Sequence, residues 1–311
     1  MLTKIILAMK KITLMLIVLI FSSCTSVVDT NQKDLNQQTS IDTNLVNKEN
    51  KDSDIKENLS MMSSGYWTEL GGNGSAIDIE AADKVWVVGQ SNTVMYYNTS
   101  TSTWVNEPGG GSGKKISSAG NLLLLTGGSN KVYYKTKGSS SSWTQLGSIT
   151  ATEISGVRNA TSLSNNSVYA IGTNNYLYKW TGSTWGTLRY PSIGLFNNYY
   201  VGVSHNFTPS ISVYFSRIDG MGINYLKLYR LDQSSSSPTD DDFIANLVKD
   251  ISVAPNGYIW FIRTDNKIGY IDNSGNVNIL SSGSGTRISI ANDGTPYIIG
   301  DSNGKIYYYT F

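Results

Sequence analysis

The chain of 311 residues contains a single cysteine and a single histidine. One cysteine excludes an intramolecular disulfide, and one histidine excludes a His-based metal cluster. Charged residues make up only 15% of the sequence, and 24 Lys and Arg residues nearly balance 23 Asp and Glu residues. No basic stripe alternates with aromatic residues, so the composition argues against a nucleic-acid partner.

Long hydrophobic runs are also absent, because no apolar stretch reaches the roughly 20 residues of a membrane-spanning helix. A shorter apolar stretch, residues 12 to 21, follows two lysines and precedes Ser22, Ser23 and Cys24. This order of basic, apolar and small residues is typical of an export signal. The second methionine, Met9, stands directly before the lysines and is a candidate start of translation.

The sequence "FSSC" at residues 21 to 24 resembles the lipobox of bacterial lipoproteins in its spirochaete-like form, with Phe21 where enteric bacteria usually carry leucine. The resemblance implies that residues 1–23 are a signal peptide and that Cys24 carries the lipid, including palmitate. The protein would then be anchored in the cell envelope, at the outer membrane or the cell surface. The alternative is an ordinary secretory signal with an incidental cysteine.

Residues 24–63 lack aromatic side chains and are rich in Asn, Gln, Lys, Asp and Ser. Such a segment cannot bury enough apolar surface to offset the entropy lost on ordering. We expect a disordered polar tether that holds a domain of residues 64–311 away from the membrane.

That domain is built from repeats. Tryptophans 67, 104, 143 and 185 stand 37, 39 and 42 residues apart, and before each of the last three lie four short β-rich segments separated by Gly, Asn and Ser turns. Two further units occupy the carboxyl end, and residues 192 to about 246 form a less regular one, with an insertion at "DQSSSSPTDDD". Four strands per period predict an all-β, six-bladed β-propeller of four-stranded blades.

The second segment of each unit is a nearly continuous apolar run, such as "VWVV" or "LLLL". Such runs predict inner strands that are buried on both faces. The last unit ends at Phe311 without a fourth segment, whereas "YWTEL" at residues 66 to 70 is a fourth-strand sequence without a unit of its own. We expect the amino-terminal strand to complete the last blade. Each closing tryptophan would cap one blade and pack on the next, or alternatively stack on a sugar.

The unit pattern, best seen in "NNYLYKWTGSTW" at residues 174 to 185, resembles the tectonin or tachylectin-type propeller repeat. The resemblance implies a lectin-like protein that binds glycans multivalently through shallow sites repeated around the ring. The irregular fourth unit and the missing tryptophans of the last two units depart from this pattern. Candidate ligand-binding residues, each also explained by a structural or merely exposed role, are Trp180, Tyr190, Asn174, Asn175, Asp265, Asn266, Asp301 and Asn303.

Enzyme chemistry has little support in the sequence. His205 is expected to be solvated, and "PGGGSGKK" at 108 to 115 lacks the first glycine and the final Ser or Thr of a phosphate loop. The run Asp240 to Asp242 lacks the spaced ligands of a calcium loop, which favours a solvated insertion over a metal site. We therefore expect a monomeric non-enzyme without a cofactor or metal. The alternative to glycan binding is a protein-interaction scaffold or adhesin that binds an envelope or host protein.

Overall fold

The fold is described from a computed structural model, in which residues 65–72, 75–189, 196–203, 212–219, 226–231 and 242–311 are defined. Within these residues every regular element is a β-strand. The signal peptide, the tether, Cys24, Tyr190, His205, Asp240 and Asp241 lie outside the described residues.

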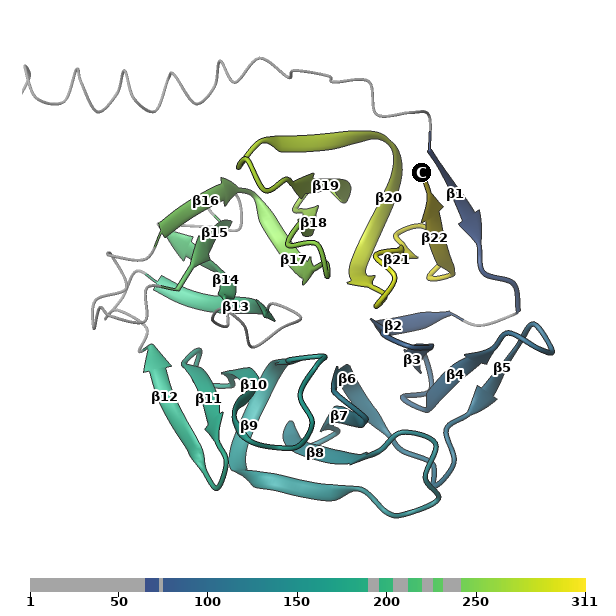
Figure 1. The fold of residues 1–311 in the computed structure, drawn as a ribbon, viewed down its shortest axis with the longest axis vertical. Helices are drawn as coiled ribbons and strands as arrows, with labels where there is room; N and C mark the ends of the chain where they lie inside the picture. The colour runs from purple at the N-terminus through teal and green to yellow at the C-terminus, as the bar shows by residue number, and fades with distance from the viewer. Residues whose placement is uncertain (1–64, 73–74, 190–195, 204–211, 220–225, 232–241) are drawn as a thin grey trace, which may run out of the picture. The chain divides into compact units, whose positions relative to one another are not determined.

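The strands form four antiparallel sheets, which Figure 1 shows set around a common centre. One four-stranded sheet contains β2 (Ala76–Ala81), β3 (Val85–Gly89), β4 (Val94–Asn98) and β5 (Thr103–Asn106). The other contains β13 (Phe196–Val203), β14 (Val213–Asp219), β15 (Leu226–Arg230) and β16 (Asp242–Asn246). The second of these is the irregular fourth unit of the sequence.

The two remaining sheets have seven strands each. The first contains β6 (Gly113–Ala119), β7 (Leu122–Gly127), β8 (Lys131–Thr136), β9 (Thr144–Gly156), β10 (Asn165–Gly172), β11 (Leu177–Thr181) and β12 (Trp185–Arg189). The second contains β17 (Val248–Val253), β18 (Ile259–Arg263), β19 (Lys267–Ile271), β20 (Val277–Ile290), β21 (Pro296–Gly300), β22 (Ile306–Thr310) and β1 (Tyr66–Glu69).

Each seven-stranded sheet consists of two consecutive repeats that share one long strand. The first half of β9 pairs with β8 and its second half with β10, and β20 divides in the same way between β19 and β21. Gly147 and Gly283 lie within the first halves of these strands and have φ of 66° and 86°. The strand thus passes from the outside of one repeat to the inside of the next without a loop.

The hydrophobic core lies between neighbouring repeats, in five clusters. Strands β3, β7 and β18 fill these clusters from both faces, because side chains at successive positions are buried. Trp86 and Trp260 are each only 2% exposed. The expectation that the second segments are buried on both faces is confirmed.

The four closing tryptophans share one environment. Each indole Nε1 donates a hydrogen bond to a backbone oxygen in the connection that precedes its own repeat; the four acceptors are Ser282 for Trp67, Gly71 for Trp104, Gly110 for Trp143 and Leu146 for Trp185. A glycine with positive φ follows each acceptor, and a Cβ on Gly72 would lie 2.6 Å from Cδ1 of Trp104. The tryptophans are structural, as expected, but they pack on the preceding unit rather than the following one.

The amino-terminal strand joins the last repeat. β1 pairs antiparallel with β22 from Tyr66 opposite Thr310 to Glu69 opposite Tyr307. Beyond the strand, Leu70 N–H donates to the Ile306 oxygen at 2.8 Å, and the Trp67 ring lies 5.0 Å from that of Tyr309. The fourth-strand sequence "YWTEL" therefore pairs where its pattern predicts.

Deleting residues 64–70 is expected to destabilise the domain. The deletion removes β1 and leaves β22 with an unpaired edge. It also removes the partly buried Trp67. Loss of a fully buried tryptophan costs about 3–5 kcal/mol, which is the upper bound here. Thermal unfolding followed by circular dichroism measures the effect, and deletion of tether residues 26–60 is the control. Equal melting temperatures for the two truncations would contradict the role given to β1.

A matched pair of point variants separates packing from strand pairing. Trp67→Ala should lower the melting temperature, whereas Tyr66→Ala should change it little because Tyr66 is 62% exposed. Both positions lie in β1 and keep the same backbone pairing. The same thermal unfolding experiment measures both variants.

Candidate functional site

The centre of the domain is built from the first strand of each repeat. β2 contacts β6, β6 contacts β9, β9 contacts β13, β13 contacts β17, and β17 contacts β20. β20 in turn contacts β2. Each of these inner strands has a β-bulge at the same register, just before one polar residue. Bulges reorient side chains locally. We call these six residues the central ring: Asp78, Lys115, Glu153, Tyr200, Asp250 and Arg287.

Arg287 connects most of the central ring. Its guanidinium lies 3.4 Å from Asp78 Oδ1, 3.0 Å from Glu153 Oε1 and 3.2 Å from Asp250 Oδ1. The same group lies 5.3 Å from the centre of the Tyr200 ring. Lys115 forms an ion pair with Glu153. Three carboxylates thus share two cations, and all five side chains are largely buried.

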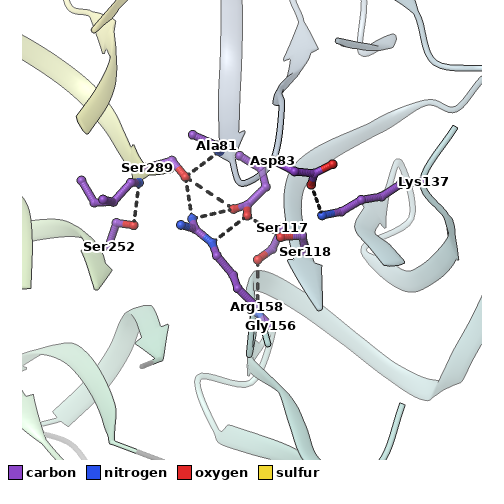
Figure 2. Close-up of polar contacts among 11 residues, drawn as sticks. Ala81, Asp83, Ser117, Ser118, Lys137, Gly156, Arg158, Ser252 and Ser289 are labelled. Atoms are coloured by element: carbon purple, nitrogen blue, oxygen red, sulfur yellow. Dashed lines mark hydrogen bonds and ion pairs between the residues drawn. The ribbon is translucent and has the colours of Figure 1, made fainter. Parts of the chain in front are cut away.

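Glu80, Ser117, Ser252 and Ser289 stand two residues beyond members of the central ring on their strands. Arg158 reaches this level from the turn after β9, with Nε 3.0 Å from Glu80 Oε1 and Nη2 2.9 Å from Ser289 Oγ, as Figure 2 shows for Arg158 and Ser289. A polar cavity of about 50 Å³ lies among these groups. Such a volume holds a few water molecules.

Side chains of one inner strand also bind the backbone of the next. Asp78 Oδ2 accepts a hydrogen bond from Ile116 N–H at 2.7 Å, and Asp250 Oδ2 accepts one from Ile288 N–H at 2.7 Å. Serines make the same kind of contact. Ser252 accepts from Ile290 between the same two strands as Asp250 and Ile288. Ser117 accepts from Gly156 and Ser289 from Ala81 between other pairs of strands, as Figure 2 shows. The last contact, at 2.8 Å, links the final inner strand to the first.

Burial shifts the pKa values of the central carboxyls upward. Desolvation raises the pKa of Asp78 to about 6 and that of Glu153 to about 7, although Lys115 opposes both shifts. Desolvation and the Glu153 charge raise the pKa of Asp250 well above its ordinary value. For Lys115, burial lowers the pKa, but the carboxylates of Glu153 and Asp78 outweigh burial and raise it overall. Burial thus favours the neutral form of the carboxyls, while Lys115 and Arg287 favour the charged form.

Sequence reasoning did not single out the central ring, although a signal was present. In every first strand a polar residue stands directly before Ile or Val, as in Asp78-Ile79, Lys115-Ile116 and Arg287-Ile288. Lys115 belongs both to "PGGGSGKK" and to the first segment of its own unit, "KKISSAG". The segment "PGGGSGKK" ends inside β6.

Trp180, a candidate for ligand stacking, is buried. It is 7% exposed, its Nε1 donates to the Leu163 oxygen at 3.2 Å, and its ring lies 5.5 Å from that of Trp185. This burial gives no support to Trp180 as part of a surface site, because β11 is covered on the face that carries this residue.

The other described candidates lie in the hairpins between second and third strands. Asn174 and Asn303 each donate to a tyrosine hydroxyl four residues later, at 2.8 and 2.9 Å, while Asn175 and Asn266 adopt φ of 63° and 69°. Only Asp265, Asn266 and Asp301 are brought together. Asp301 Oδ2 accepts hydrogen bonds from Asn266 Nδ2 at 3.2 Å and from Ser284 Oγ at 2.7 Å.

A larger cavity lies between the β2–β5 sheet and the repeat that contains β21 and β1. It has a volume of about 370 Å³, within the range of ligand sites. We call it the junction groove. Its lining includes Leu70, Asp83, Tyr97, Thr99, Asp293 and Tyr297.

No protein-family model matches the chain, and no curated protein matches it. Solved structures do match. The β-propeller domain of Cps50 (Swd1) from Myceliophteria thermophila is 10% identical with a TM-score of 0.53, over 79% of this chain and 99% of that one. The Xanthomonas campestris gluconolactonase XC5397 is 9% identical with a TM-score of 0.56, over 81% and 91%. The domain is a β-propeller. At these identities the likeness establishes the fold alone.

Two further observations concern only the described part of this propeller. It contains no helix that is long and apolar enough to cross a membrane. Likewise, no group of three or more His, Cys, Asp or Glu side chains within it is arranged to hold a metal ion.

The central carboxyls predict that the free energy of unfolding rises as the pH falls from about 8 to about 5. The pKa values of about 6 for Asp78 and about 7 for Glu153 exceed those of an unfolded chain, so the folded state binds more protons across this interval. This stabilisation is complete below the unfolded-state pKa and is lost as the pH rises through the folded-state values. We expect a change on the order of 1–3 kcal/mol.

Urea unfolding at a series of pH values measures this dependence. Glu153→Gln removes one titrating group and should flatten the slope. A stability that falls between about pH 8 and 5 would contradict the assignment.

Proposed function

We propose that the propeller has six blades and that β1 closes the ring. Each of the six bulged inner strands would begin one blade, with β9 and β20 shared between two blades each. The pairing of β1 with β22 and the Ser289 to Ala81 hydrogen bond support closure across the chain ends. The hydrogen bond from Trp67 to Ser282 also supports closure, because each of the other closing tryptophans makes the equivalent hydrogen bond to the repeat that precedes its own.

We also propose that Cys24 is lipid-modified and holds the propeller at a membrane of the cell envelope. Two or more acyl chains give stable anchoring, since each buried methylene contributes about 0.8 kcal/mol. The polar residues 25 to 63 would act as the tether. Outer-membrane or surface display is the location that we favour.

Replacing Cys24 with Ala is expected to abolish incorporation of labelled palmitate and to leave an unprocessed precursor. Metabolic labelling followed by immunoprecipitation measures both effects. The matched control is Ser23→Ala, which keeps a small residue before the cysteine. Palmitate on the Cys24→Ala protein would rule out this anchor.

The anchored propeller is, in this proposal, a non-catalytic module that binds a protein partner. One observation supports this proposal above others: the centre holds only about 50 Å³ among paired charges, whereas the junction groove offers about 370 Å³ between two repeats. A ligand would therefore bind at a repeat junction. The hairpin residues that were candidates for repeated ligand sites do not line the junction groove. We therefore expect one ligand per chain.

Glycan binding, which the repeat pattern favours, is the second candidate. The tyrosines, the Asp293 carboxylate and the Asn98 amide of the groove are groups that suit uncharged polar ligands. The hairpin candidates favour it less, because Asn174, Asn303 and Asp301 already form hydrogen bonds within the protein.

The two candidates are separated by presenting the full chain, in detergent, to a glycan array and to a random peptide library on phage. We expect selected peptides that bind with one ligand per chain by calorimetry. Binding to a glycan that strengthens steeply when the sugar is displayed densely would instead favour the repeated glycan sites. Absence of binding in both formats would contradict a binding function of either kind.

A further inference from the structure

The junction groove can be compared with equivalent places at other repeat junctions. The aromatic residues Trp86, Trp260 and Tyr297 occupy the same register in their second strands. Each pairs on one side with Glu80, Ser252 or Ser289 of the inner strand, and on the other with a third-strand tyrosine, Tyr96, Tyr270 or Tyr308. Each aromatic ring packs at the interface with the following repeat.

At two of these junctions the following repeat covers the aromatic ring with its own side chain. The covering residue lies three positions after the third-strand tyrosine that is equivalent to Tyr96. It is Lys137, after Tyr134, at one junction and Phe311, after Tyr308, at the other. Lys137 Nζ lies 4.9 Å from the centre of the Trp86 ring. The Phe311 ring lies 6.0 Å from that of Trp260 in an edge-to-face arrangement.

The hairpin before the aromatic residue differs between these two junctions in a way that matches the covering group. Before Trp86 stands Asp83, and its Oδ1 lies 2.6 Å from Lys137 Nζ, a pair that Figure 2 shows. Before Trp260 stand Pro255 and Asn256, which carry no charge. The hairpin thus carries a carboxylate where the covering residue is the cation Lys137, and no charge where the covering residue is the aromatic Phe311.

At Tyr297 the covering position is Thr99, three residues after Tyr96, and its short exposed side chain leaves the junction groove open. The hairpin before Tyr297 carries Asp293, an exposed carboxylate. Asp293 and Tyr297 both line the groove. Burial and, next, the charge of Asp293 raise the pKa of Tyr297. The groove therefore retains the aromatic ring and the acid of the Trp86 junction, but its covering position carries no cation. Lys84 also lines the groove.

We propose that the junction groove binds a lysine or arginine side chain of a partner polypeptide, with the cation over Tyr297 and paired with Asp293. A cation over an aromatic face is attracted by the ring quadrupole, and more strongly when the site is partly desolvated. The neighbouring charges leave this position free: Asp83 pairs with Lys137, and Lys84 Nζ lies over the Tyr96 ring at 4.8 Å. The inference deepens the proposed function and rests on it for the source of the side chain.

The first test fills the groove from within. Thr99→Lys places a cation where Lys137 stands at the neighbouring junction, whereas Thr99→Gln adds a similar length without charge. We expect Thr99→Lys to raise the melting temperature of the full chain relative to Thr99→Gln. The gain should disappear when Asp293→Asn is introduced, because double-mutant cycles isolate the pairwise term. An equal gain with and without Asp293 would overturn the cation site, and so would no gain at all.

The second test uses peptides selected from the phage library on the wild-type full chain in detergent. We expect them to contain a basic residue whose replacement by norleucine weakens binding roughly tenfold. Thr99→Lys should weaken binding by at least a similar factor, while Thr99→Gln should retain most of it.

Each outcome bears on a definite claim. Peptides that bind Thr99→Lys as tightly as wild type would overturn the groove assignment but leave the proposed function standing. Selected peptides that bind through an aromatic residue would overturn the cation site. They would indicate that the groove takes an aromatic ring, as Trp260 takes that of Phe311. If no peptide binds although Thr99→Lys is stabilised through Asp293, the cation site stands and the protein partner fails.

Discussion

The structure depends on how the innermost strands satisfy their free edges. In a sheet that points its first strand toward a central axis, that strand has no further neighbour, and its backbone N–H groups need acceptors. Here the acceptors are side chains of the adjacent inner strand. Asp78, Asp250 and three serines supply them, and in doing so they join one sheet to the next. The first role of the polar residues at the centre of the domain is therefore to accept hydrogen bonds from backbone N–H groups.

The central charges follow from that requirement. Once carboxylates are buried as acceptors, they need cations, and Arg287 suits the position because its planar guanidinium has five donors in a fixed geometry. It reaches Asp78, Glu153 and Asp250 while it lies on the Tyr200 face. Lysine offers a single ammonium and no planar face, so Arg287→Lys would leave carboxylates unpaired. Removal of one partner from a buried ion pair is costly, whereas the intact pair adds little net stability.

The sequence allowed a large part of this fold to be predicted, because apolar runs, turn residues and spaced tryptophans are local signals. The second strands, the role of Trp67 and the position of the "YWTEL" strand all came from such signals. Trp180 shows where they fail. Its turn-rich surroundings indicate exposure, but burial depends on a neighbouring repeat that is distant in the chain. The central ring was missed for a related reason, since each member is one polar residue beside an isoleucine or valine and only the packing of the inner strands against one another brings the residues together.

A repeated scaffold can tolerate a groove at one junction because only the side chain of the covering residue shields the aromatic ring, and that side chain takes no part in strand pairing. Lys137 and Phe311 lie beyond the third strands and shield an aromatic face, whereas pairing and the tryptophan contacts are made elsewhere. Uncovering about 40 Å² of such a face costs about 1 kcal/mol at 25 cal/mol per Å². This is small beside the loss of an inner-strand contact, which would leave buried polar groups unpaired. A replacement such as Thr99 can thus open a binding position at the Tyr297 junction while the inner strands and their hydrogen bonds stay as they are in the other repeats.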